Sequence, residues 1–571
     1  MKPLIFALLY QNPIKLTRLT LLILLLLSYI SASAQQLSLE IKGLNTIETQ
    51  SIDSIGYQKK IQNAKLLLTE VNSFTQKLAK VGYINNQIIS TTQPTDSTFS
   101  YQYSLGPKTS QILLYIGKNP NLKNILFPAH SSDTLSIPLS NVESFLNNKL
   151  SELEIKGFSL ATLRLINFQV VNNQLTADID ISTGKQRELN DIVISGYDKF
   201  PKGHLKNIKR LYRNKPFNQQ TLNKLQTDFQ KFRFVNQTKN PEILFSQDTT
   251  KVYLYLEKAK PNKFDGFIGF ANDEESQKLL FTGYLDLMLV NFVNTGEELS
   301  IYWKSDGKEQ KTFNASVQLP YVFKTPFGVK AMLNIFKQDS TFQNTRTALD
   351  IGYFFNYNTR LYLGYQSTES SDIQNLNSFN LQDFKNSFVT TTLEFTDFNT
   401  SDILFPEKTR LNLKTGLGKR ASKLTTNNQV FAEINAHHNL YLNDKNSFSV
   451  RSQNFYLQSE KYVINELHRF GGINSIRGFQ ENSLQGNMLT SLLTEYRYIP
   501  TSNLYVHTII DYAYFRDDSA TNSGGLLGLG FGLGLLTNNG MLNLVYANGS
   551  TKEQTIKLSN SIVHISFKTT F

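Results

Sequence analysis

One short stretch of this sequence, residues 470–479, could do chemistry; it reads Phe-Gly-Gly-Ile-Asn-Ser-Ile-Arg-Gly-Phe. The adjacent glycines Gly471 and Gly472 allow the backbone to turn with a positive φ, and Gly478 allows a second reversal. The pattern therefore predicts that Arg477 lies at the tip of a compact turn. Its guanidinium offers five N–H donors and no acceptor, so it is suited to bind carboxylates. A solvated surface loop is the competing interpretation of this stretch taken alone.

Residues that could catalyse a reaction or bind a metal form no recognisable group elsewhere. The chain has no cysteine, which excludes disulfides, thiolate chemistry, Cys-ligated zinc and a lipid-modified N-terminal cysteine. His437 and His438 are adjacent, but no third ligand stands at a useful spacing. A Ser/His/Asp arrangement and a nucleotide-binding loop are also absent from the sequence. We therefore predict a protein that is not an enzyme, without catalytic residues, metal or cofactor.

Glycines alternate with apolar residues in the run 528–534, Gly-Leu-Gly-Phe-Gly-Leu-Gly. A phosphate-binding loop would be followed by Gly-Lys-Ser/Thr and would open a helix. This run has neither property and lies within sequence of period two. It is therefore predicted to form the inner face of a sharply curved strand.

The composition favours β-structure that is apolar on one face only. The chain of 571 residues is long enough for several domains and has 40 Phe and 27 Tyr, yet it has no apolar run of membrane-helix length beyond the N-terminus. Such a composition is typical of half-apolar sheets. The net charge is +12, but the lysines and arginines are spread along the chain. This pattern favours a solvated surface over nucleic-acid binding.

Residues 1–34 have the pattern of a secretory signal peptide. Lys15 and Arg18 precede the apolar run 19–27, and the small residues 31–34 supply a cleavage site. The apolar run is too short to span a bilayer as a helix. The sequence therefore predicts an exported protein that begins near Gln35.

Residues 36–261 show a weak internal repeat of about 75 residues. Each unit opens with a strand that ends on glycine, at 39–43, 114–117 and 192–196, and closes with alternating strands. Between them lies a helix with apolar residues at spacings of three and four. These residues are Leu67, Val71, Phe74 and Leu78, then Val142, Leu146, Leu150 and Leu153, then Leu222, Leu225, Phe229 and Phe232. The repeat predicts three small α/β domains, at 35–110, 111–187 and 188–261, which form a jointed arm.

Two interpretations of this arm stay open. Its exposed strand edges could accept an extended client chain as an added strand, or the units could be generic α/β spacers. The third unit also contains a basic stretch, 202–215, next to the following domain. A solvated helix face is favoured there over a contact with anionic lipid.

Alternation with period two dominates the domain 262–571. In the last strand, for example, Val563, Ile565 and Phe567 alternate with His564, Ser566 and Lys568. Strands with one apolar and one polar face suit a membrane barrel, which has lipid outside, a polar lumen inside and no unpaired edge. At about 19 residues per strand and connection, the length predicts a transmembrane antiparallel β-barrel of about 16 strands. A large soluble β-sandwich would also alternate, but the export signal and the aromatic richness argue against it.

Four motifs follow one another towards the C-terminus: Ile476-Arg477-Gly478-Phe479, then 493–500, 509–513 and 540–547. In this order they resemble the C-terminal half of the bacterial surface antigen superfamily, the family of BamA, TamA and the two-partner secretion exporters. The three α/β units resemble the polypeptide-transport-associated (POTRA) domains of that family. Three such units before a barrel most resemble the layout of TamA.

The resemblance implies that the Ile-Arg-Gly-Phe loop folds back into the barrel. Arg477 would then meet acidic partners on the next two strands, Glu495 and Asp511, and charge-assisted hydrogen bonds would pin the loop. The family usually has glycine two residues after this aspartate, where the present chain has Ala513.

The resemblance further implies a seam between the first and last strands, at 264–270 and 562–571, to which a client strand can add. The last strand carries Phe567 and ends on Phe571. A terminal aromatic residue is a habit of the family that marks a barrel for its own insertion.

The implied function is that of a non-enzymatic assembly factor in the bacterial outer membrane, with the N-terminal domains in the periplasm. Its partners would be unfolded outer-membrane protein clients, the lipid bilayer and a periplasmic or inner-membrane protein that binds the arm, but no nucleic acid. The alternative is an exporter for one dedicated secreted protein. Such exporters typically have two POTRA domains and an N-terminal plug helix, whereas this chain shows three units and no evident plug. A passive porin would explain neither the arm nor the loop.

Overall fold

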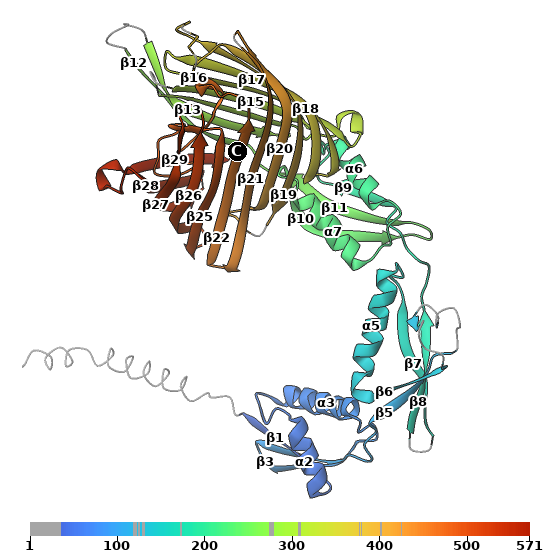
Figure 1. The fold of residues 1–571 in the computed structure, drawn as a ribbon. Helices are drawn as coiled ribbons and strands as arrows, with labels where there is room; N and C mark the ends of the chain where they lie inside the picture. The colour runs from blue at the N-terminus through green and yellow to red at the C-terminus, as the bar shows by residue number, and fades with distance from the viewer. Residues whose placement is uncertain are drawn as a thin grey trace, which may run out of the picture. The chain divides into compact units, whose positions relative to one another are not determined.

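The computed structural model describes residues 36–570, except 118–122, 124–125, 128–131, 172–173, 273–278, 307–309, 376, 379, 400–401, 424 and 539 (Figure 1). The predicted signal peptide, 1–34, and Phe571 lie outside the described residues. The chain divides between Gln186 and Arg187 into two compact units. Each unit is described by itself.

The first unit contains two small sheets built on one plan. The first comprises β1 (Leu37–Gly43), α2 (Thr46–Ile55), β2 (Lys60–Ile61), α3 (Ala64–Val81), β3 (Gln87–Thr95) and β4 (Thr98–Ser104). The second comprises β5 (Gln111–Tyr115), β6 (Thr134–Pro138), η1 (Leu139–Asn141), α5 (Val142–Ile155), β7 (Thr162–Val171) and β8 (Gln174–Ser182). The strand orders are β2-β1-β4-β3 and β6-β5-β8-β7, and the opening strand pairs in parallel with β4 or β8. The repeat in the sequence is therefore a repeat of topology.

Helix α3 shows why these segments fold locally. The side chain of Asn63 caps its N-terminus by accepting a hydrogen bond from the backbone N–H of Leu66. The four apolar residues at helical spacing are all buried: Leu67, Val71, Phe74 and Leu78. The helix ends at Gly82, whose φ of 115° lies in the left-handed region. No helix in the described part of the chain is long and apolar enough to cross a membrane.

The second unit begins with a third sheet of the same kind. Its elements are β9 (Asp191–Ser195), α6 (Lys202–Tyr212), α7 (Gln219–Gln230), β10 (Val235–Phe245) and β11 (Thr250–Lys258). Strand β9 pairs in parallel with β11, as β1 does with β4. The domain boundaries at 110, 187 and 261 stay a prediction.

The third sheet is docked on the barrel through one continuous apolar core, which includes Val290 of the barrel. His204 of α6 is 1% exposed and packs edge-on against Phe232 of its own sheet and Tyr321 of a barrel turn. Neither ring nitrogen has a hydrogen-bond partner among the residues that the structure describes. Burial, and secondarily the nearby Arg360 cation, lowers the pKa of His204 to about 3, so the ring is neutral at physiological pH.

Sixteen strands form one closed antiparallel barrel, as the sequence predicts. They are β12 (Lys263–Asn272), β13 (Leu279–Val290), β14 (Glu298–Ser305), β15 (Gln310–Leu319), β16 (Phe327–Gln338), β17 (Phe342–Asn356), β18 (Thr359–Asp372), β19 (Phe384–Phe398), β20 (Glu407–Ser422), β21 (Thr426–Asn443), β22 (Asn446–Gln458), β25 (Met488–Thr501), β26 (Leu504–Asp517), β27 (Asn522–Thr537), β28 (Gly540–Thr551) and β29 (Ile562–Thr570). Each strand pairs with the next one, and β29 returns to β12.

The two faces of the wall differ as the alternation predicts. On β17, Leu349 and Ile351 are exposed on the outer face, while Asp350 between them is buried inside. On β26, Ile510 and Tyr512 flank the buried Asp511 in the same way. An apolar outer face around a polar interior is the arrangement that a barrel in a bilayer requires.

Candidate functional site

The connection between β22 and β25, residues 459–487, folds back into the barrel. It contains a 3₁₀ turn, η3 (Ile464–Glu466), and two short paired strands, β23 (His468–Phe470) and β24 (Leu484–Gly486). The turn between them has positive φ angles at Gly471 (105°), Gly472 (96°) and Gly478 (88°), which other residues rarely adopt. These angles place Arg477 against the inner surface of the wall.

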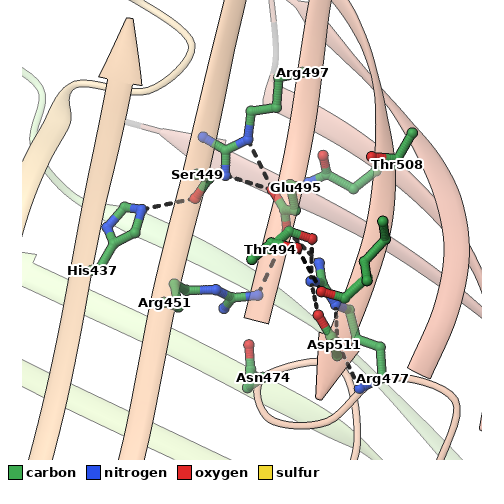
Figure 2. A network of polar contacts seen from close by, with 12 residues as sticks. His437, Ser449, Arg451, Asn474, Arg477, Thr494, Glu495, Arg497, Thr508 and Asp511 are labelled. Atoms are coloured by element: carbon green, nitrogen blue, oxygen red, sulfur yellow. Dashed lines mark hydrogen bonds and ion pairs between the residues drawn. The ribbon is translucent and has the colours of Figure 1, made fainter. Parts of the chain in front are cut away.

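Arg477 is 2% exposed and is held by two carboxylates of the wall (Figure 2). Asp511 on β26 accepts from Arg477 Nε at 2.7 Å, from Nη2 at 2.5 Å and from its backbone N at 3.1 Å. Glu495 on β25 accepts from Nη1, and the Thr494 carbonyl accepts from Nη2 at 3.4 Å. A buried cation needs such partners, because its desolvation is otherwise strongly unfavourable. The structure thus brings together the three charged residues that the sequence singles out.

Apolar residues beside Arg477 fix the turn. Ile476 is fully buried in a cluster with Leu493 and Ala513, and Phe479 packs against the same cluster. Ala513 stands where the family usually has glycine, and here its side chain contributes to this packing. The departure from the family pattern is therefore accommodated within the loop's apolar contacts.

Glycines allow the loop backbone to lie directly on the wall. A β-carbon at Gly528 would overlap the carbonyl oxygen of Arg477, and one at Gly549 would overlap that of Gly478. Conversely, a β-carbon at Gly478 would overlap the backbone of Asn548. The glycine run 528–534 lies within strand β27 and opens no helix, so it is no phosphate-binding loop.

The charged network extends beyond the residues that the sequence singles out. Glu495 also accepts from Nε and Nη2 of Arg497, at 2.8 and 2.6 Å, and lies 3.6 Å from Nη2 of Arg451 (Figure 2). The Arg497 guanidinium lies over the ring of Phe405 at 3.9 Å. The carboxylate of Glu495 therefore interacts with three arginines, Arg451, Arg477 and Arg497. The two-residue spacing of Glu495 and Arg497, which puts both on one face of a strand, is a signal that could have identified Arg497.

His437 belongs to this polar interior. Its ring nitrogens lie 3.2 Å from Glu407 Oε1 and 3.1 Å from Ser449 Oγ. His438 points to the other face of the strand and bonds to Thr409 Oγ1 at 2.8 Å. Among the described residues, no group of three or more potential ligands could hold a metal.

A second buried ion pair holds the loop near its start. Glu466 of η3 pairs with Arg420 of β20, and both side chains are 1% exposed. Gln429 donates to the same carboxylate at 2.8 Å, and the backbone N of Val463 donates to it at 3.0 Å. Arg420 and Glu466 stand 46 residues apart and outside any motif, so no signal in the sequence connects them.

The loop also reaches wall strands far from Arg477. Glu481 pairs with Lys304 of β14 and accepts from Tyr302 Oη at 3.3 Å. Arg469 Nη1 donates to Gln338 of β16 at 3.2 Å. The loop therefore extends across the lumen and contacts wall strands from β14 to β28.

A short pairing between the first and last strands closes the barrel. Strands β12 and β29 pair only at Lys263 with Thr570 and at Phe264 with Thr569 within the described residues. By contrast, β12 pairs with β13 along its entire length. As far as the structure describes these strands, the facing edges of β12 and β29 are therefore without a strand partner along most of the seam. Phe567, predicted as part of the terminal signal, is exposed on the outer face of β29.

No protein-family model and no curated protein sequence matches the chain. Among solved structures, CdiB from Escherichia coli aligns over 88% of this chain and 98% of its own, at 15% identity and a TM-score of 0.51. CdiB from Acinetobacter baumannii aligns over 81% and 90%, at 17% identity and a TM-score of 0.50. BamA from Haemophilus ducreyi lacking POTRA domains 1–3 aligns over 81% and 99%, at 13% identity and a TM-score of 0.46.

The two CdiB alignments include most of this chain and nearly all of each CdiB chain, so the fold is shared. The closed barrel of sixteen strands and the preceding α/β sheets agree with the architecture that the sequence predicts. The chain therefore has the fold of the two CdiB structures.

Proposed function

We propose that this protein is a non-enzymatic assembly factor in the bacterial outer membrane, which inserts client barrel proteins or translocates parts of them. The three N-terminal sheets would lie in the periplasm. The observation that carries the proposal is the seam, where β12 and β29 pair at Phe264 and Thr569 and not beyond in the described residues. Two strand edges in the wall are thereby available for an added strand.

Strand addition at this seam has a clear driving force. A backbone N–H or C=O without a partner costs several kcal/mol in hydrocarbon. A client strand that pairs with the edge of β12 or β29 removes this cost for both chains. The seam would thus template the first strands of a client while its later strands form.

The N-terminal sheets offer a second place for an extended chain. Strand β3 is the outer strand of the first sheet, and all of its residues are exposed. Its free edge provides a row of backbone donors and acceptors. We propose that such edges receive unfolded clients, or a periplasmic or inner-membrane partner protein.

The position of the loop supports assembly at the seam over export through the lumen. The loop is tied to β26 through Arg477, to β20 through Glu466 and to β14 through Glu481. A dedicated exporter, the alternative function, would have to break these contacts to pass its substrate. The fold alone is compatible with both functions.

Depletion of the protein, followed by quantitative proteomics of the outer membrane, tests the proposal. We expect many unrelated barrel proteins to be lost. Loss of one secreted protein from the medium, with the barrels intact, would overturn the assembly role in favour of the exporter.

A disulfide across the seam tests the site itself, because the chain has no native cysteine. Ile268 and Ile565 would face each other if the pairing of Phe264 with Thr569 continued in register, and both are exposed on the outer face. An oxidised Ile268→Cys/Ile565→Cys variant should fail to rescue depleted cells, and reductant should restore rescue.

The matched control joins two strands that are already paired. Leu349 of β17 lies opposite Tyr365 of β18, and both are exposed on the outer face. The Leu349→Cys/Tyr365→Cys variant should rescue the cells whether oxidised or reduced. Full rescue by the oxidised seam variant would contradict strand addition at the seam.

A further inference from the structure

Helix α6 and its C-cap residue, Arg213, carry a stripe of basic side chains along one face. The stripe consists of Lys202, Lys206, Arg210 and Arg213, all of them exposed. Spacings of three and four residues place these side chains on the same side of the helix. The other face of α6 is buried through His204, Asn207, Ile208 and Tyr212. The basic stripe is therefore the surface that α6 offers to its surroundings.

Within the described part of the chain, no carboxylate forms an ion pair with the basic stripe. The neighbouring Lys209 has such a partner, Asp191, at 2.6 Å. Like charges four residues apart destabilise a helix, and Lys202 also stands at the N-terminal end, where the helix dipole disfavours a cation. Electrostatic repulsion within the basic stripe thus destabilises α6 in the protein alone, and an anionic partner would relieve this repulsion.

The stripe borders the outer surface of the barrel. Asn207 Nδ2 donates to the carbonyl oxygens of Lys324 and Thr325, at 3.4 and 3.1 Å, in the turn between β15 and β16. Arg210 Nη1 lies 3.5 Å from the hydroxyl of Tyr353, on the outer face of β17. Helix α6 therefore lies at the rim of the barrel, beside β17 (Figure 1).

Aromatic side chains mark this part of the rim. The Tyr353 ring contacts those of Phe327 and Phe355, with centroids 5.5 and 5.1 Å apart. Phe323, in the turn that α6 contacts, is 93% exposed. Aromatic residues at the rim of a membrane barrel lie at the level of the lipid headgroups. The basic stripe beside them would then lie at the depth of the lipid phosphates.

We propose that the basic stripe binds the headgroups of anionic phospholipids in the leaflet at this rim. The inference rests on the proposed place of the barrel in a bilayer. Four cations would meet the lipid phosphates, while Phe323 and Tyr353 enter the headgroup region. This contact holds the third sheet on the membrane surface. Each basic residue near an anionic surface contributes roughly a five-fold gain in affinity.

Native mass spectrometry of the full chain in neutral detergent micelles tests this proposal. The wild type should retain phosphatidylglycerol in preference to phosphatidylcholine as each lipid is titrated. The variant K202Q/K206Q/R210Q/R213Q should bind phosphatidylglycerol at least about ten-fold more weakly. The charge-preserving variant K202R/K206R should bind it like the wild type. Because these side chains are exposed, heat-modifiable migration in gels should show an intact barrel in every variant.

A control variant removes the same charge from the opposite rim. It replaces four exposed lysines, Lys385, Lys419, Lys423 and Lys461, with glutamine. This variant should retain phosphatidylglycerol as the wild type does. Unchanged phosphatidylglycerol binding in the stripe variant would overturn the proposal. An equal loss of binding in the control variant would also overturn it, because lipid binding would then depend on the net charge of the protein and not on the basic stripe. The lipid measurement uses purified protein, whereas the assembly role is tested in cells. A negative result for lipid binding can therefore be distinguished from a negative result for the assembly role.

Discussion

The carbonyl oxygen of Arg477 lies directly over Gly528, with no room for a side chain between them. Gly528 on β27 is also the cross-strand neighbour of Asp511 on β26. The carboxylate that binds the guanidinium and the glycine that admits the backbone therefore form one site on adjacent strands. The loop is held by close backbone contact as well as by charge.

We expect Gly528→Ala to loosen the loop, because the added methyl must displace the backbone of Arg477. Overpacking of this kind typically costs about 1–3 kcal/mol. Thermal unfolding followed by heat-modifiable migration would measure the loss. Gly524→Ala on the same strand is the control, since its β-carbon would meet nothing closer than 3.8 Å. Equal unfolding temperatures for the two variants would show that the close contact is unimportant.

Arg477→Ala should destabilise the barrel by about 3–5 kcal/mol, because it leaves Asp511 buried without its cation. Arg477→Lys should recover part of this loss, since a lysine keeps the charge but not the fork of donors. Lys385→Ala, which removes a largely exposed pair with Glu369, should leave the stability almost unchanged because solvent screens this pair. If Arg477→Ala matches the wild type in both heat stability and rescue of depleted cells, the loop is not anchored as described.

Glu495 and Arg497 should be strongly coupled, because the carboxylate accepts two hydrogen bonds from this guanidinium. In a double-mutant cycle with Glu495→Gln and Arg497→Met, we expect an interaction free energy of about 0.5–3 kcal/mol. Asp511 and Arg497 do not contact each other directly, so Asp511→Asn and Arg497→Met should show a smaller interaction free energy. Additivity in the first cycle would show that Glu495 and Arg497 do not stabilise each other.

The buried His204 makes stability depend on pH. Its pKa is about 3 in the folded protein against 6.5 for the exposed side chain, so only the unfolded chain is protonated between these values. The stability that the neutral His204 contributes is therefore fully present above pH 6.5. This contribution falls by about 1.4 kcal/mol per pH unit as the pH drops towards 3. His204→Phe should remove this contribution while keeping stability at pH 7.5, because neither ring nitrogen has a partner to lose.

Denaturant unfolding of the wild type and His204→Phe at pH 7.5, 6.0 and 5.0 would check this expectation. The difference between the two proteins isolates the histidine from the other titrating groups. Parallel stability profiles would contradict a histidine that is buried and neutral.

The barrel could be predicted because its signal is local. The alternation of Leu349, Asp350 and Ile351 already assigns each side chain to a face. Arg477, Glu495 and Asp511 could be proposed as partners because a family motif and its order along the chain supplied the pairing. Neither inference required knowledge of the path of the loop.

Other contacts could not be predicted, because they depend on that path. Arg420 and Glu466 meet only since η3 passes β20 inside the barrel, and no spacing in the sequence encodes this. The basic stretch 202–215 is another case. Its pattern alone favours a solvated helix face, and only the contact of Arg210 with Tyr353 shows which surface it borders.

An even number of strands has a consequence for topology mapping. Strand β29 returns to the rim where β12 begins, so that Thr570 pairs with Lys263 close to the third sheet. Lys423, in the connection between β20 and β21, lies at the other rim. Single cysteines at 423 and 570 would therefore sample the two compartments, and one membrane-impermeant maleimide applied to whole cells would assign every connection of the wall by parity.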